Sequence, residues 1–178
     1  GESPLDKDGI LRSSIPDLVK YLEEFKSKGS WEEPTEEGLA KTLRAVVKED
    51  PNRFVNDLGS FQKTNYRYVY NILAGIEDAW REKKAFDWGK VFEFSKQYID
   101  KSDFLESGKK AQGEDWHAYH IWILDALADL IQEGSRDDPW AFAEQYFSKA
   151  DEILVTIFLI LKTQPKPKKE EKTHSAYV

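Results

Sequence analysis

The chain has 178 residues, of which 40% are hydrophobic and 33% charged, and this balance is typical of one folded domain rather than of a disordered chain. A net charge of -7 disfavours binding to the phosphate backbone of nucleic acids and to anionic membrane surfaces. The absence of cysteine excludes disulfide bonds and zinc–thiolate sites.

Neither end of the chain indicates a membrane protein. The longest apolar run, over 153–161, is far shorter than the roughly 20 residues that a membrane-spanning helix needs. The first residues, GESPLD, do not resemble a signal peptide. We therefore expect a cytoplasmic protein, and the lack of any methionine indicates that the native start lies elsewhere.

The first part of the chain carries two amphipathic patterns with helix caps. Ser14 can cap a helix over 15–28, which Gly29 ends. Thr35 can cap the next helix, which carries two glutamates in its first turn. The apolar residues of this second helix recur at helical spacing: Leu39, Leu43, Val46 and Val47.

Two further helices are predicted before the middle of the chain. Asp50 and Pro51 provide the cap and the first residue of a short third helix. Asn65 or Thr64 opens a fourth helix, which continues to about Lys83. One face of this fourth helix is apolar and aromatic: Tyr66, Val69, Ile72, Leu73, Ile76 and Trp80.

The second half begins with a fifth helix capped by Asp87. The polar stretch 100–113 follows and is the best candidate for a long loop. A sixth helix is predicted over 114–133, with Gly134 as its stop.

A second Asp-Pro pair, Asp138 and Pro139, predicts another helix start after that loop. The last helix, over 148–161, is apolar nearly all round at its end, and such a helix is normally buried between others. The tail is rich in proline, lysine and glutamate, which favours an extended or disordered segment.

These patterns predict an all-α fold of seven or eight helices in antiparallel hairpins. We expect residues 1–162 to form a single helical domain and residues 163–178 to form a linker to a following region. The sequence similarity between residues 50–54 and 138–142 is too weak to establish a repeat. An irregular solenoid and an orthogonal bundle therefore both remain open.

One short motif could bind a metal ion or act in catalysis. Glu114 and His117 form a Glu-x-x-His step, the spacing found in di-iron helical bundles, and His120 lies three residues further on. Such sites also need a second copy of the motif and carboxylates from other helices. No phosphate-binding glycine loop is present either. We expect no cofactor, with a small helical metal-binding or hydrolytic enzyme as the alternative.

The tryptophans offer a second kind of candidate site. Most of them are expected to belong to the core, although the set could line a ligand groove, as in a ligand-binding helical regulator: Trp80, Trp88, Trp116, Trp122 and Trp140. Trp122 lies about half a turn away from the apolar stripe of its helix and is expected to face a second surface. Trp31 lies in a loop. We take Trp122 and Trp31 as candidate interaction residues.

Three stretches resemble a known type of helical region. They are Gly38–Phe54 (GLAKTLRAVVKEDPNRF), Phe86–Phe94 (FDWGKVFEF) and Ala126–Gly134 (ALADLIQEG). They look like helical regions that follow the nucleotide-binding module in large prokaryotic ATPases of the NACHT-like signal-transduction type, many of them associated with anti-phage defence. The resemblance covers roughly 35–138 and implies a scaffold or sensor arm of a larger cytoplasmic protein. It transfers no catalytic residue.

The sequence thus favours a non-enzymatic helical scaffold or sensor that acts through protein–protein contacts. Its expected partner is another protein or the neighbouring domains of the same polypeptide. Nucleic acid and membrane are not expected partners.

Overall fold

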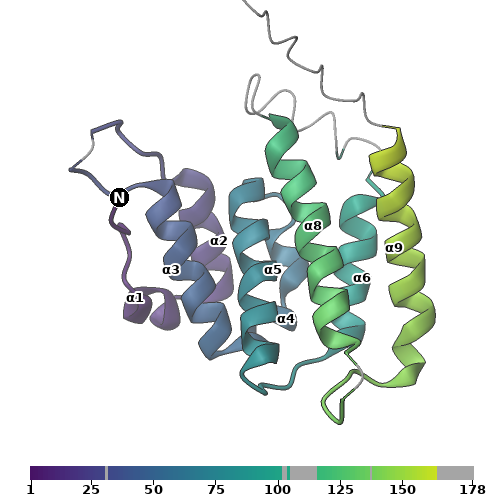
Figure 1. Ribbon diagram of the computed structural model, residues 1–178. Helices are drawn as coiled ribbons and strands as arrows, with labels where there is room; N and C mark the ends of the chain where they lie inside the picture. Colours follow the sequence, from purple (N-terminus) through teal and green to yellow (C-terminus); the bar gives the residue numbers. More distant parts are fainter. Residues whose placement is uncertain (31, 102–103, 105–115, 137, 164–178) are drawn as a thin grey trace, which may run out of the picture.

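Figure 1 shows the computed structural model, which describes residues 1–30, 32–101, 104, 116–136 and 138–163, without the side chains of 116–119. Within these residues the structure has eight α-helices, two short 3₁₀ helices and no strand, which confirms the all-α prediction. The α-helices are α1 (Lys7–Arg12), α2 (Ile15–Glu24), α3 (Glu36–Glu49), α4 (Pro51–Val55), α5 (Tyr66–Arg81), α6 (Trp88–Ile99), α8 (Trp116–Gly134) and α9 (Phe147–Lys162). The 3₁₀ helices are η1 (Leu58–Phe61) and η3 (Glu144–Tyr146).

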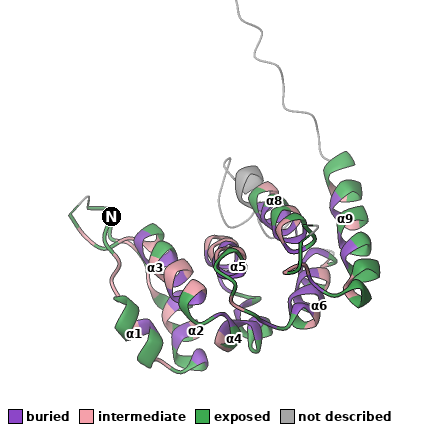
Figure 2. Cartoon of the chain, turned by 60° about the horizontal axis from the view of Figure 1, so that its bottom comes forward, coloured by how far each residue is buried: buried purple, intermediate pink, exposed green. Residues whose placement is uncertain are grey.

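The helices form two rows. The long helices α3, α5 and α8 lie side by side and run in the same direction, and α5 packs against both of its neighbours. A second row is made of α2, α4, α6 and α9 (Figure 2). The chain passes through α4 between α3 and α5, and through α6 between α5 and α8. Consecutive helical hairpins therefore lie next to one another, as the prediction of antiparallel hairpins requires.

Predicted capping residues begin most of the longer helices. Ser14 accepts a hydrogen bond from a backbone N–H in the first turn of α2, and Thr35 does the same for α3. Asn65 begins α5 in this way, and Asp87 accepts two such bonds at the start of α6. These bonds satisfy N–H groups that have no partner within their own helix.

The boundary predictions fail near the start of the chain. The first predicted helix ends at Glu24, four residues before the expected end, and Gly29 lies in the following loop with a φ of +87°. A short additional helix, α1, precedes it and was not predicted. Pro51 is the first residue of α4 as expected, but the side chain of Asp50 makes no capping hydrogen bond.

The second Asp-Pro pair does not start a helix, so this prediction is wrong. Asp138 accepts a hydrogen bond from the backbone N–H of Trp140 at 2.7 Å and forms a turn. The turn directs the indole of Trp140 onto Trp80, where the ring centroids are 4.4 Å apart. The indole N–H of Trp140 also donates to the carbonyl of Trp80 at 2.9 Å. These contacts hold residues 138–140 against α5 in a turn, and the segment does not form a helix.

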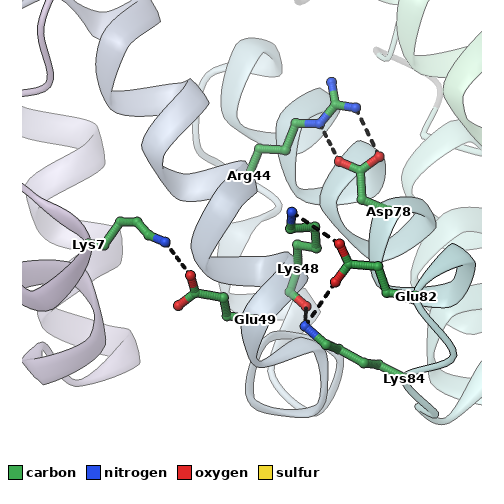
Figure 3. A network of polar contacts seen from close by, with 7 residues as sticks. All are labelled: Lys7, Arg44, Lys48, Glu49, Asp78, Glu82 and Lys84. Carbon is green, nitrogen blue, oxygen red and sulfur yellow. Dashed lines mark hydrogen bonds and ion pairs between the residues drawn. The ribbon is translucent and has the colours of Figure 1, made fainter.

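Ion pairs link neighbouring helices along one end of the stack (Figure 3). Arg44 of α3 donates two hydrogen bonds to Asp78 of α5, at 2.7 and 3.1 Å. Glu82, just after α5, pairs with Lys48 and Lys84, each at 3.2 Å. A further pair joins Lys7 to Glu49 and holds α1 against α3. The two-point geometry of the Arg44–Asp78 pair adds a directional contact between α3 and α5.

The prediction that the last helix is buried between others is wrong in part. Ala150, Ile153 and Ile157 face the core, and α9 packs against α6 and α8. No other described element covers the opposite face of α9, and Figure 2 shows much of this helix as exposed. Its apolar residues were expected to contact neighbours on all sides. In the part of the chain that the structure describes, α9 lies at the end of its row and has neighbours on one side only.

Candidate functional site

Trp122 lies on the side of α8 that faces away from the core. Its neighbours Ile123 and Leu124 are buried, whereas 46% of Trp122 is exposed to solvent. The structure thus places Trp122 on a second surface of α8, as its phase in the sequence predicts. An exposed tryptophan offers a large, rigid contact area and is a common anchor of protein interfaces.

Trp122 lines a groove between the three helices of the long row. Two adjoining hollows of about 350 and 370 Å³ meet at this residue. They share Arg44 of α3, Tyr70 of α5 and Trp122 of α8. The rings of Tyr70 and Trp122 lie 6.1 Å apart and form an aromatic floor between the hollows. We call this feature the Trp122 groove.

Charge differs between the two ends of the Trp122 groove. Lys41 and Arg67 line one end together with Glu37, which pairs with Lys41 at 2.9 Å. The pKa of Glu37 is lowered by the hydrogen bond from Lys41. The other end is acidic and is lined by Glu77, Asp125 and Asp129.

The acidic end brings three carboxylates close together, although Arg44 also lines this hollow and Arg81 pairs with Glu77. Asp125 and Asp129 are exposed and lie in no ion pair with any described residue. Partial burial raises the pKa of Asp125, and the nearby charge of Asp129 raises it further. A cationic group that binds here would relieve this repulsion.

Glu77 is the most buried carboxylate of the groove, and its side chain is 13% exposed. Burial raises the pKa of Glu77, and the negative charges of Asp129, Glu133 and Asp78 raise it further. The guanidinium of Arg81, 3.1 Å from a carboxylate oxygen of Glu77, acts in the opposite direction. Because the pKa in the folded state lies above the ordinary 4.5, the proton binds more tightly to the folded chain. The stabilisation from this group is therefore complete below pH 4.5 and is lost as the pH rises through the folded-state pKa.

We expect the Glu77→Gln variant to gain stability relative to the wild type as the pH rises from about 4 to about 7. Urea unfolding at several pH values measures this difference. Glu49→Gln is the control of opposite sign, because the hydrogen bond from Lys7 lowers the pKa of Glu49. The Glu49 variant should lose relative stability over the same range. A Glu77 variant whose difference from the wild type is independent of pH would contradict the effect of burial.

The possible metal or catalytic centre is only partly described. Glu114 and the side chain of His117 lie outside the described residues. His120 is buried at 1% exposure, and its ring lies 4.1 Å from that of Tyr66 and 4.7 Å from that of Phe104. Among the described side chains, no three His, Asp or Glu residues gather in an arrangement that could hold a metal ion. The described surroundings of His120 are those of an aromatic core.

The other tryptophans follow the core prediction where their side chains are described. Trp80 and Trp88 are buried, and Trp140 is partly buried against Trp80. Trp31 and the side chain of Trp116 lie outside the described residues. Among the tryptophans whose side chains are described, Trp122 is the one that still fits the ligand-groove interpretation.

Sequence reasoning missed the partners of Trp122 in the groove. Arg44 and Tyr70 belong to other helices, 78 and 52 residues earlier in the chain. No local pattern signals their proximity, because it follows from the stacking of α3, α5 and α8. The exposed face of α9 was also missed, and its only signal was a helix that is apolar nearly all round.

Comparisons of the chain with family models, with curated proteins and with solved structures find no match. In the part of the chain that the structure describes, no helix combines the length and the apolar character that crossing a membrane requires.

Proposed function

We propose that this chain is a non-enzymatic helical scaffold that binds a partner protein in the Trp122 groove. The observation that carries the proposal is a 46% exposed tryptophan on an aromatic floor between three parallel helices. Stacked helical hairpins commonly use such extended surfaces to bind other proteins. The role as an arm of a larger cytoplasmic, prokaryotic signalling protein belongs to the same proposal and is supported by the sequence resemblance alone.

The lining of the groove defines the chemistry of the partner. The aromatic floor of Tyr70 and Trp122 suits an apolar side chain, and the carboxylates of Asp125 and Asp129 suit a lysine or an arginine. We therefore expect a segment in which a basic residue lies near an aromatic or aliphatic one. The basic and acidic ends of the groove would then fix the direction in which the segment binds.

The expected result of a partner search is recovery of a specific protein by the wild-type chain and its loss with Trp122→Ala. Interface tryptophans often contribute 2 kcal/mol or more, so binding should weaken by roughly 30-fold or more. Affinity capture followed by cross-linking and mass spectrometry measures both recovery and contact sites. Cross-links of the partner should fall on α3, α5 and α8.

Leu11→Ala is the matched control, because Leu11 is also an exposed large apolar residue but lies on α1. This variant should bind the partner as the wild type does. A partner that binds the Trp122 variant and the wild type equally well would refute the assignment of the groove.

A further inference from the structure

The outer face of α9 is an apolar surface that none of the other described elements covers. Six of its side chains are large, hydrophobic and exposed: Phe147, Leu154, Val155, Phe158, Leu159 and Leu161. Val155 and Phe158 are exposed to 57% and 63%. Elsewhere in the described residues, only Leu11 and Trp122 are large hydrophobic side chains with comparable exposure. Contiguous apolar surface of this kind marks an interaction site.

The exposed residues of α9 follow the spacing of a coiled-coil seam. Phe147, Asp151, Leu154, Phe158 and Leu161 are separated by alternating steps of four and three residues, and all of them are exposed. This spacing places them in one line along the helix, which is the line that a second helix contacts. Asp151 is the single charged residue in the line, and Lys162 lies beside its far end.

We propose that α9 pairs with α9 of a second copy of this chain, in antiparallel orientation. This orientation places Leu154 opposite Phe158 of the second copy and brings Asp151 close to Lys162 of the second copy. A two-fold axis repeats each of these contacts, because the same surface is used by both chains. In a parallel pair, Asp151 would face Asp151 of the other chain and the like charges would repel.

Charge and composition favour a second copy as the occupant. Asp151 in the seam and Lys162 beside it carry opposite charges, so the overall charge of -7 is not concentrated there. The composition of residues 164–178 does not suit the apolar face of α9, because apart from prolines their only apolar residues are Ala176, Tyr177 and Val178. The face of α9 therefore complements itself better than it complements the tail that follows it.

Self-association should depend on concentration. Two helices of this length bury less than the roughly 800 Å² per partner of a standard interface, so we expect a dissociation constant in the micromolar range. Sedimentation equilibrium of the full chain from about 1 to about 500 µM should show a shift from one chain mass to two. A single chain mass over the whole range would overturn the proposal.

Phe158→Glu should weaken the dimer by at least about 100-fold, because it places a charge in the centre of the apolar seam. Leu11→Glu is the matched control and should leave self-association unchanged. Circular dichroism should show both variants folded, since both wild-type side chains are exposed. A dimer that survives Phe158→Glu does not use α9, and this result would also overturn the proposal.

A charge exchange tests the orientation. Asp151→Lys and Lys162→Asp should each weaken the dimer by roughly tenfold, because the symmetric interface contains the pair twice. The double variant should restore the wild-type constant to within about threefold. Failure of the restoration would overturn the antiparallel pairing. Trp122→Ala should not affect self-association, so this inference and the proposed function can fail independently.

Discussion

The Trp88→Ala variant is expected to lose about 3–5 kcal/mol of the free energy of unfolding. Trp88 is buried, and its ring lies 5.0 Å from Trp80, 4.9 Å from Phe86, 5.3 Å from Phe92 and 4.9 Å from Phe142. These four residues come from α5, α6 and the segments beside them. Truncation would leave a cavity where these parts of the chain meet, and the surrounding rings could fill it only in part.

Trp122→Ala provides the comparison for Trp88→Ala, because it is the same substitution at an exposed position. Its cost in unfolding free energy should stay within about 0.5 kcal/mol, the usual range for surface changes. Urea unfolding followed by circular dichroism measures both values. If the Trp122 variant were as unstable as the Trp88 variant, Trp122 would belong to the core and would not be an available anchor for a partner. Partner binding and stability together therefore separate the two classes of tryptophan.

Local chemistry made much of the helical framework predictable. Ser14, Thr35, Asn65 and Asp87 each cap a helix where the sequence indicates it, because a capping side chain acts on N–H groups only two or three residues away. Such short-range effects are visible in the sequence. The ends of helices were less predictable, as the early end of α2 at Glu24 shows.

The two Asp-Pro pairs show why local chemistry is insufficient. Pro51 begins α4, whereas Asp138 and Pro139 form a turn. The difference lies in tertiary contacts, because Trp140 stacks on Trp80 and donates a hydrogen bond to its carbonyl. A residue some 60 positions earlier in the chain thus determines the local structure.

The candidate surfaces were predictable to different degrees. The phase of Trp122 on α8 indicated exposure, since a residue half a turn from the apolar stripe cannot face the same neighbours. The remaining lining of the groove depends on how three helices stack. The exposure of the outer face of α9 was not predicted. A helix that is apolar nearly all round has the same sequence pattern whether its outer face packs against the same chain or against a partner. Only the position of α9 at the end of its row distinguishes the two cases.

We expect Gly75→Leu to lower the free energy of unfolding by about 3 kcal/mol, with the loss arising from packing. Gly75 is buried in α5 where this helix crosses α3, and a Cβ atom at this position would lie 2.7 Å from the carbonyl oxygen of Arg44 and 2.9 Å from Cβ of Val47. Backbone atoms cannot move aside as the end of a side chain can. Leucine forms helices better than glycine, so helix propensity alone predicts a gain in stability.

Gly59→Leu is the matched control for Gly75→Leu, because no atom lies within 4 Å of a Cβ atom built on Gly59. Thermal and urea unfolding should place this control within about 0.5 kcal/mol of the wild type. If Gly75→Leu unfolds as the wild type does, α3 and α5 must be able to separate without cost. The Trp122 groove would then lose its fixed shape, because Arg44 and Tyr70 are held in position by this same contact between α3 and α5. The close approach at Gly75 is thus a condition for the binding surface as well as for the fold.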